Sequence, residues 1–245
     1  MKILLLDIET APHLATVWGL WQQNVALNQI IRTGYTLCWA AKWYGEREIK
    51  FESIVSATPR QMISRIHRLL AEADAVVHYN GSKFDIPTLN KEFLLYGMTP
   101  PAPYAQIDLL RTARQRFRLA SNKLDFVAQT LGLGQKTQHK GHELWLGCMN
   151  KDAESWKVME KYNKNDVVLL EKIYERLLPW IKGHPNHSVF NREQVCPHCE
   201  SDRIQARGTS KTKAGEYQRY QCKDCGSWFR DNRSISPRAK FLEVA

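Results

Sequence analysis

The stretch Lys2-Ile3-Leu4-Leu5-Leu6-Asp7-Ile8-Glu9-Thr10 decides the fold of this chain. Its apolar run is short and unbroken, which is typical of a central strand buried on both faces. Successive side chains alternate across a strand, so Asp7 and Glu9 point to the same side. Two neighbouring carboxylates at the end of a buried strand repel each other, and a raised pKa or bound cations relieve that repulsion. The stretch alone fits either a metal site or a strand that simply ends in polar residues.

Strands and helices are expected to alternate through the first 182 residues. After the opening strand, the predicted strands are 35–44 and 49–56, which form a hairpin, followed by 74–79 and 106–110. The predicted helices begin at Thr58-Pro59, run from 84 to about 97, cover 122–131, and extend from 154 or 155 to about Trp180. This order predicts an α/β fold, in which a mixed five-stranded sheet is flanked by helices and carries a site at its strand ends.

Composition and charge narrow the class of protein. No run approaches the ~20 apolar residues of a membrane span, and the apolar run before Asp7 is too short for a signal-peptide core. A cytoplasmic protein without a membrane partner is therefore expected. The formal net charge is +10, to which residues 1–190 contribute +6 and residues 191–245 contribute +4. A basic protein with a carboxylate cluster favours a polyanionic substrate, although a generically basic surface is the bland alternative.

Two further carboxylates can join the opening pair. Asp85 follows a strand end and a glycine turn in Asn80-Gly81-Ser82-Lys83-Phe84-Asp85, which places it at the carboxyl edge of the sheet. Asp166 lies in the long helix, four residues after Tyr162 and therefore on the same helix face. Four carboxylates in one cleft cannot all be ionised without counter-charge. Two divalent cations would supply that charge, and oxygen ligands favour Mg²⁺ or Mn²⁺.

A pair of such ions ~3.5–4 Å apart is a known arrangement for hydrolysis of phosphoesters. Tyr162, with an ordinary pKa of about 10, is a poor base, so we expect it to position the attacking water by a hydrogen bond. The candidate catalytic residues are Asp7, Glu9, Asp85, Tyr162 and Asp166.

These residues carry a resemblance to a known family. Asp7-Ile8-Glu9-Thr10, Asn80…Phe84-Asp85 and Tyr162-x-x-x-Asp166 resemble the three exonuclease motifs of the DEDD superfamily, which has an RNase H-like fold. The order matches, and the gaps of 76 and 81 positions are suitable. Residues 122–132 also resemble the helix that these enzymes place between the second and third motifs. The tyrosine form of the third motif is that of polymerase proofreading domains; the other branch would need histidine at position 161, which is lysine.

The resemblance spans roughly residues 1–182 and implies 3′→5′ removal of nucleoside 5′-monophosphates. It implies that Asp7 bridges two Mg²⁺ or Mn²⁺ ions, that Glu9 and Asp166 complete one ion site, and that Asp85 holds the other ion. Single-stranded DNA is the favoured substrate, and replication or repair proteins are conceivable partners. RNA stays open as a substrate, because two-metal chemistry is indifferent to the 2′-OH. A non-catalytic nucleic-acid-binding or recruitment module with a vestigial nuclease fold is the alternative from another class.

Four of the six cysteines form two C-x-x-C knuckles. Cys196-Pro197-His198-Cys199 and Cys222-Lys223-Asp224-Cys225 are separated by 22 residues, a pattern that predicts a structural Cys₄ site for one Zn²⁺. A unit of about 40 residues is too small to fold on an apolar core alone, so the metal is expected to stabilise it. The pattern resembles the zinc ribbons of insertion-sequence transposases. Cys38 and Cys148 stand alone and are expected to be buried thiols.

The expected organisation is an RNase H-like exonuclease domain at 1–182, a linker at 183–192, a zinc ribbon at 193–232 and a tail at 233–245. A basic hairpin with interleaved aromatic residues lies between the knuckles, which suits nucleic acid; a structural cap or a protein-docking ribbon are the alternatives. The candidate substrate-binding residues of the whole chain are Thr10, Asn80, Lys140, Arg207, Lys211, Lys213, Tyr217 and Trp228.

Several residues near these motifs keep two interpretations. Trp18 and Trp21 can stack on bases or pack within the protein, and packing is the commoner role of tryptophan. The polar loop 136–142 either contacts backbone phosphates or is simply solvated. His78 is expected to be a packed core histidine, whereas two further acids, Asp108 and Asp125, fit none of the motifs and are expected beside the site or at the surface.

Overall fold

The computed structural model of the protein describes residues 1–191 and 194–236. The chain divides into two compact units, one over residues 2–173 and a C-terminal one that begins at Tyr174. Within the described residues, every helix is too short or too polar to cross a membrane.

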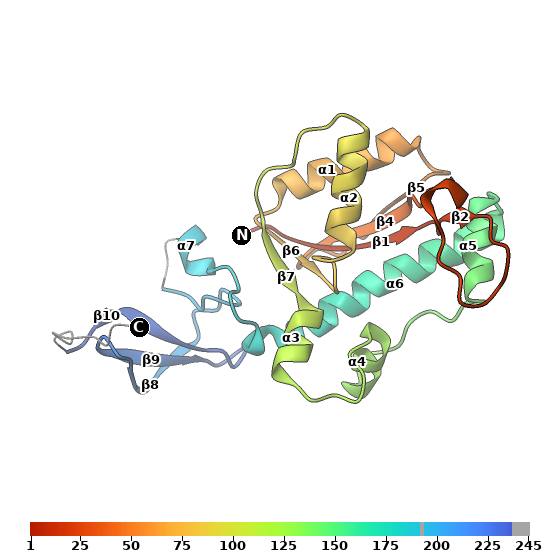
Figure 1. The fold of residues 1–245 in the computed structure, drawn as a ribbon. Helices are drawn as coiled ribbons and strands as arrows, with labels where there is room; N and C mark the ends of the chain where they lie inside the picture. The colour runs from red at the N-terminus through yellow and green to blue at the C-terminus, as the bar shows by residue number, and fades with distance from the viewer. Residues whose placement is uncertain (192–193, 237–245) are drawn as a thin grey trace. The chain divides into compact units, whose positions relative to one another are not determined.

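A five-stranded mixed sheet forms the centre of the first unit (Figure 1). Its strands, in spatial order, are β5 (Lys50–Ser53), β4 (Thr36–Trp43), β1 (Ile3–Thr10), β6 (Ala75–His78) and β7 (Ala105–Asp108). β1 pairs antiparallel with β4 and parallel with β6, and β6 pairs parallel with β7. The predicted mixed five-stranded sheet, with the opening stretch as its central strand, is confirmed.

The two faces of β1 have different neighbours. Leu4, Leu6 and Ile8 pack against α1 (Pro59–Glu72) and α2 (Asp85–Leu95) in one apolar core. The alternate residues face the long helix α6 (Ala153–Leu177), because Asn163 of that helix bonds to Asp7. Figure 1 shows α1 and α2 on one side of the sheet and α6 on the other. The period of two along β1 therefore places both carboxylates on the α6 side.

The helices agree with the sequence expectations where their local signals are strong. α1 begins with a capping box in which Thr58 and Gln61 bond reciprocally, followed by Pro59 at the first position. α4 (Leu124–Thr130) lies inside the expected 122–131 helix. α6 ends at Leu177, and a 3₁₀ turn, η2 (Leu178–Trp180), follows where the helix was expected to continue, because Pro179 has no N–H to donate.

Two helices of the first unit were not predicted. α3 (Leu109–Arg116) begins directly after β7, because the Asp108 carboxylate accepts hydrogen bonds from the N–H groups of Leu110 and Arg111. The strand expected to reach 110 therefore ends at Asp108. α5 (His142–Met149) follows the polar loop 136–141. A Cβ on Gly147 would meet the Ser155 hydroxyl oxygen at 2.0 Å, so a residue without a side chain lets α5 lie against α6.

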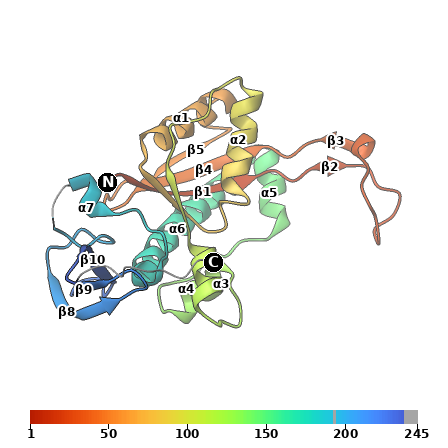
Figure 2. The ribbon, with the colours of Figure 1, turned by 60° about the vertical axis from the view of Figure 1, so that its left-hand side comes forward.

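A hairpin extends from the end of β1. It consists of β2 (Leu14–Ala15), η1 (Leu27–Gln29) and β3 (Ile30–Arg32), with β2 and β3 antiparallel. Figure 2 shows this arm leaving the five-stranded sheet and projecting beyond it.

The C-terminal unit contains α7 (His187–Asn191) and a three-stranded antiparallel sheet. Its strands are β8 (Ile204–Lys211), β9 (Glu216–Cys222) and β10 (Trp228–Ser234), in the spatial order β10-β9-β8. The hairpin expected between the knuckles is β8–β9, and β10 adds a third strand. α7 lies inside the stretch that was predicted to be a linker, and residues 237–245 of the expected tail lie outside the described residues.

Candidate active site

Three carboxylates converge at the centre of the first unit. One oxygen atom from each of Asp7, Glu9 and Asp166 lies within 4.8 Å of the other two. β1 supplies the first pair and α6 supplies the third, so residues 157 or more positions apart in sequence meet at one point. Of the four predicted carboxylates, these three form the tight group.

Asp85 lies beside this group without belonging to it. It is the first residue of α2, and its Oδ1 accepts a hydrogen bond of 3.1 Å from the backbone N–H of Ile8. Ile8 lies between Asp7 and Glu9 in the chain, so this bond fixes Asp85 against the strand that carries them. The Asp85 charge also raises the pKa values of both β1 carboxyls.

Lys136 provides a cation at the centre of the site. Its Nζ donates a hydrogen bond to Oδ2 of Asp166 and another, of 2.9 Å, to the hydroxyl oxygen of Tyr162. The ammonium also lies 4.9 Å from the centre of the Tyr162 ring. Tyr162 and Asp166 are four residues apart on α6 and share a face, as predicted, so one lysine contacts both.

A second residue of α6 forms hydrogen bonds with Asp7, the first carboxylate of β1. The side-chain amide of Asn163 donates a 2.6 Å hydrogen bond to Oδ2 of Asp7 and a 3.3 Å bond to its backbone oxygen. Asn163 is fully buried. Its amide therefore fixes the orientation of the Asp7 carboxylate.

Aromatic side chains line the site on the α5 side. The rings of His139, Trp145 and Tyr162 meet edge to face, with centroids 4.9–6.0 Å apart. The Trp145 indole also forms a hydrogen bond with Glu9. These contacts hold the Tyr162 ring in place and keep part of the site away from bulk water.

The carboxyl groups of the site are hard to ionise together. Burial raises the pKa of Asp7 well above its usual value, and the Asp166 and Glu9 charges raise it further. Burial likewise raises the pKa of Glu9 to about 8, although Lys136 opposes the shift. The pKa of Asp85 rises to about 7 through burial, opposed by the Ile8 N–H. Lys136 supplies one positive charge among four carboxyls, so further positive charge is needed to ionise the group.

The chemistry of this donor set fits divalent cations. Carboxylate oxygens are the ligands that Mg²⁺ and Mn²⁺ prefer. The Oδ1 atom of Asp166 is buried and has no hydrogen-bond partner within the described residues. A buried carboxylate oxygen without a donor is unfavourable unless a cation approaches it. Asp7, Glu9 and Asp166 could therefore hold divalent ions, and Asp85 lies where it could complete their coordination.

The other residues of this unit that were predicted to bind substrate lie at a strand end or in loops. Thr10 ends β1. The backbone N–H of Asn80 donates to Asp108 Oδ1 at 3.0 Å, so Asp108 anchors the loop that leads to Asp85. Lys140 is exposed in the loop before α5.

His78 is fully buried and contacts Gln106, which confirms its expected place in the core. Cys38 and Cys148 are also buried, as expected.

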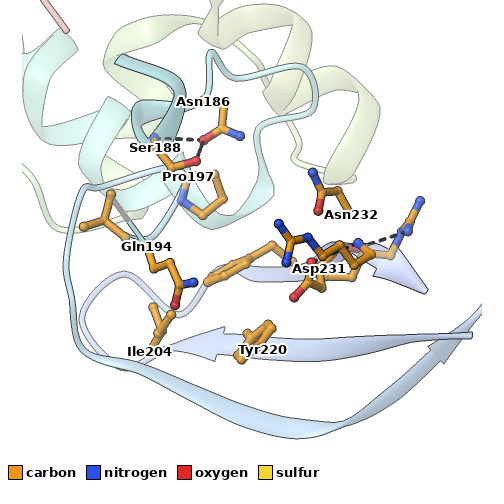
Figure 3. A pocket seen from close by; sticks show the side chains of 12 residues that line it. Asn186, Ser188, Gln194, Pro197, Ile204, Tyr220, Asp231 and Asn232 are labelled. Carbon is orange, nitrogen blue, oxygen red and sulfur yellow. Dashed lines mark hydrogen bonds between the residues drawn. The ribbon is translucent and has the colours of Figure 1, made fainter. Parts of the chain in front are cut away.

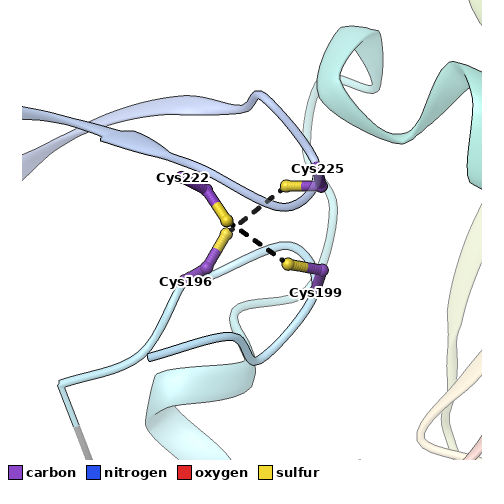
Figure 4. Close-up of side chains that lie close together, drawn as sticks. All are labelled: Cys196, Cys199, Cys222 and Cys225. Atoms are coloured by element: carbon purple, nitrogen blue, oxygen red, sulfur yellow. Dashed lines mark hydrogen bonds between the residues drawn. The ribbon is translucent and has the colours of Figure 1, made fainter. Parts of the chain in front are cut away.

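In the C-terminal unit, the four knuckle cysteines converge (Figure 4). Their sulfur atoms all lie within 4.8 Å of one another, with Cys196 to Cys225 at 3.7 Å and Cys199 to Cys222 at 3.6 Å. A tetrahedron of sulfur atoms around zinc, at Zn–S ≈ 2.3 Å, has edges of about 3.8 Å. The observed sulfur spacing therefore fits a tetrahedral zinc ion.

The ribbon sheet alternates arginine and aromatic side chains. The Arg219 guanidinium lies 5.0 Å from the Trp228 ring centre, and Arg230 lies 3.9 Å from that of Tyr217. Trp228 is half exposed, whereas Tyr217 is buried, so the face of Tyr217 is occupied by Arg230 and not open to a base. The remaining predicted contacts of the ribbon are exposed and lie along or after β8, namely Arg207, Lys211 and Lys213.

Near the cysteines, three histidine rings stack. His184 lies between His187 and His198, with ring centroids at 5.9 and 5.4 Å, and its Nε2 bonds to the Tyr174 hydroxyl at 2.7 Å. The predicted polar linker is thus packed at His184. A cavity of ≈ 560 Å³ lies on the ribbon beside the stacked rings of Tyr220 and Phe229 (Figure 3).

Sequence reasoning missed three members of the site: Lys136 as a partner of Asp166 and Tyr162, Asn163, and the Trp145 indole. Asn163 could have been identified, since it directly follows Tyr162 on the inward side of α6. The positions of Lys136 and Trp145 depend on the loop before α5, for which no sequence pattern was available.

Comparisons with known proteins agree with the fold of the first unit. The family model described as the RNase_H superfamily matches residues 4–178. A comparison with curated protein sequences gives no match. Among solved structures, the chain is similar to a family B DNA polymerase from the hyperthermophilic archaeon Pyrobaculum calidifontis, with a TM-score of 0.55 and 19% identity. The likeness covers 73% of this chain and 24% of the polymerase, so it concerns the fold of one part of that larger protein.

Proposed function

Since the chain belongs to the RNase H superfamily, we propose that it is a metal-dependent nuclease that removes nucleoside 5′-monophosphates from the 3′ end of single-stranded DNA. One observation carries the proposal. The oxygens of Asp7, Glu9 and Asp166 meet within 4.8 Å, beside a tyrosine hydroxyl and a lysine ammonium. That is the set of groups needed to hydrolyse a phosphodiester bond with the help of divalent ions.

The carboxylates would bind the metal ions and set their positions. Asp7, Glu9 and Asp166 would bind two Mg²⁺ or Mn²⁺ ions, with Asp85 completing the second site. When bound, such ions act as Lewis acids on the scissile phosphate and favour ionisation of the attacking water. Asn163 keeps the Asp7 carboxylate in the orientation that this requires, through its 2.6 Å hydrogen bond.

Tyr162 and Lys136 position the reacting groups. The Tyr162 hydroxyl accepts a hydrogen bond from Lys136 Nζ, and its own proton can be donated to Asp166 or to an attacking water or a phosphate oxygen. Burial raises the pKa of Tyr162, and the Asp166 charge raises it further, so the phenol stays protonated and orients rather than removes a proton. The Lys136 ammonium lies near the expected place of the phosphate and stabilises its developing charge.

Two observations support the direction of cleavage and the choice of substrate. The pattern Tyr162-x-x-x-Asp166 supports removal from the 3′ end, because it resembles the third motif of the tyrosine branch of DEDD exonucleases. The likeness to a DNA polymerase favours DNA over RNA.

The C-terminal ribbon is proposed as a second nucleic-acid contact. One Zn²⁺ held by its four cysteines would stabilise it, while the exposed Arg207, Lys211, Lys213 and Trp228 side chains would contact the strand. The three basic side chains are exposed along or just after β8, which suits a phosphate backbone.

One series of assays tests the proposal. Single- and double-stranded DNA and RNA, labelled at the 5′ or the 3′ end, are incubated with Mn²⁺ or Mg²⁺ and the wild-type protein or Asp166→Asn. We expect 3′-labelled single-stranded DNA to release labelled mononucleotide at once, and 5′-labelled DNA to give a shortening ladder. Faster cleavage of RNA would change the proposed substrate, and activity retained by Asp166→Asn would overturn the proposed site.

A further inference from the structure

The arm that leaves β1 carries the most exposed large apolar side chains of the first unit. Trp18 is 98% exposed and Trp21 84% exposed, and two leucines beside them, Leu20 and Leu27, are similarly open. Packing was the commoner expectation for the two tryptophans, and the structure shows that neither packs. A cluster of open apolar side chains of this kind marks a binding surface.

The arm is a folded hairpin. Its two sides are joined by the bond from Thr16 N–H to the Gln29 oxygen, at 3.0 Å. The Gln29 side chain bridges them again, accepting from Ala26 N–H at 2.8 Å and donating to the Thr16 oxygen at 3.0 Å. At the base, Ala11 N–H donates to the Tyr35 oxygen at 2.8 Å. Trp18 and Trp21 lie between the two sides of this hairpin, in the loop 17–25, where both are exposed to solvent.

The arm is continuous with the candidate active site. Glu9 and Thr10 end β1, and the arm follows directly. Trp18 follows Glu9 by nine positions, a contour of at most ~32 Å for an extended chain. A stacked nucleic-acid strand advances ~3.4 Å per nucleotide, so the arm's tip lies within about nine nucleotides of the site.

The charge of the arm suits a polyanion. No aspartate or glutamate occurs between Glu9 and Glu46, so nothing on the arm repels phosphates, and Arg32 adds a positive charge to β3. Indole faces stack on any nucleobase without regard to sequence. The arm is apolar, aromatic and free of acids, and it begins at a candidate site for nucleic acid. It therefore fits unpaired bases better than it fits a basic protein surface.

We propose that residues 12–33 form an arm whose Trp18 and Trp21 side chains stack on unpaired nucleobases of the substrate. These bases lie on the 5′ side of the nucleotide being removed. This rests on the proposed function, because it takes the substrate to be a nucleic acid whose 3′ end lies at the carboxylates. The arm then holds the remaining strand while successive nucleotides are released. Its contribution grows with strand length, because only a strand that extends beyond the site reaches the tip.

The experiment measures the dissociation constants of a 4-nucleotide and a 30-nucleotide oligo(dT), by competition in fluorescence anisotropy with chelator present to prevent cleavage. The full-length protein is compared with Trp18→Ala/Trp21→Ala, with Trp18→Phe/Trp21→Phe, which retains aromatic faces, and with Leu94→Ala/Leu95→Ala, which removes exposed apolar side chains of α2. Because both tryptophans are exposed, their replacement leaves the core intact, which circular dichroism checks.

We expect the alanine pair to bind the 30-mer about 10-fold or more weakly and the 4-mer within about 2-fold of wild type. The phenylalanine pair and the α2 control should bind both oligonucleotides about as wild type does. Unchanged binding of the 30-mer would overturn the proposal, as would equal losses at both lengths. The proposal would also be overturned if the alanine pair lost self-association or binding to lipid vesicles while its affinity for the 30-mer stayed unchanged. The arm would then bind another partner. Failure of the proposed function is a separate result: the wild type would release no nucleotide, whatever the arm binds.

Discussion

The Nζ atom of Lys136 lies 2.9 Å from the hydroxyl oxygen of Tyr162 and also donates a hydrogen bond to Asp166. One ammonium group thus links the tyrosine and the acid of the third motif. Lys136 reaches this position because its own backbone N–H bonds to Asp125 at 2.7 Å, which fixes the loop after α4. Asp125, an acid that fits none of the motifs, therefore places a cation in the site.

Replacing Lys136 by methionine should lower kcat by about 10²-fold, because the site loses a positively charged donor close to the phosphate and to Tyr162. The stem of methionine fills similar space. Steady-state kinetics with single-stranded DNA measures the effect. Lys161→Met, which removes an exposed charge next to Tyr162 on α6, is the matched control and should keep wild-type rates. Equal losses in both variants would assign the effect to net charge.

Replacing Tyr162 by phenylalanine should lower kcat by about 10²-fold with little change in KM, because only the positioning hydroxyl is removed. The double variant Lys136→Met/Tyr162→Phe should lose far less than the product of the single losses, since the two groups act as one unit. Fully multiplicative losses would show that Lys136 and Tyr162 act independently.

Without divalent ions, the first unit should become less stable as the pH rises. The folded protein keeps the Glu9 proton up to about pH 8 and the Asp85 proton up to about pH 7, whereas the unfolded chain loses them near 4.5 and 3.8. Between these values the folded state binds more protons than the unfolded state, so its free energy of unfolding falls with rising pH. Thermal unfolding in chelator at pH 5 to 8 measures this.

The same groups predict how metal ions act on stability. Mn²⁺ should raise the unfolding temperature more at pH 8 than at pH 6, because it binds the ionised carboxylates and favours the folded state. Glu9→Gln should flatten the pH dependence seen in chelator. A stability that rises between pH 5 and 8 in chelator would contradict the assigned pKa shifts.

Asn163→Leu should weaken Mn²⁺ binding about 10- to 100-fold, because the Asp7 carboxylate loses the amide that orients it. Isothermal titration calorimetry measures the affinity directly. The carboxylates themselves stay in place, so saturating Mn²⁺ should restore much of the activity. If excess Mn²⁺ restores nothing, the role of Asn163 is structural.

The four cysteines should hold one zinc ion per chain. Cys199→Ser should lose that zinc and with it the folded ribbon, since so small a unit depends on its metal. Metal analysis of the purified protein, together with limited proteolysis, checks both effects. Cys148→Ala, which removes a buried thiol outside the cluster, should retain one zinc. A zinc content unchanged by Cys199→Ser would exclude the cysteine site.

What the sequence could predict follows from local geometry. The period of two along β1 places Asp7 and Glu9 on one face, and the helical period places Tyr162 and Asp166 on another, so each pair could be predicted from spacing alone. Their meeting on one face of the sheet is also predictable, because β1 is central and α6 is long enough to cover it. The C-x-x-C spacing fixes each cysteine pair in the same local way.

The contacts that the sequence did not predict depend on loops. Lys136 lies in a segment with no periodic pattern, and its place is set by Asp125 and by α5, itself unpredicted. The strand expected to reach 110 ends at Asp108 because that carboxylate caps α3, a competition between two local structures that apolar pattern alone cannot resolve. Exposure of Trp18 and Trp21 likewise depends on a hairpin with only a short ladder of strand pairs.

Metal-dependent cleavage at the carboxylate site is tested by the release of the 3′-terminal nucleotide from 3′-labelled single-stranded DNA in Mn²⁺, with the wild type and with Asp166→Asn. Asparagine keeps the shape of the side chain but removes the charge that meets Asp7 and Glu9 within 4.8 Å. We expect rapid release of labelled mononucleotide by the wild type, none in chelator, and a loss of about 10³-fold or more in the variant. Equal release by both proteins, or release that persists in chelator, would contradict it.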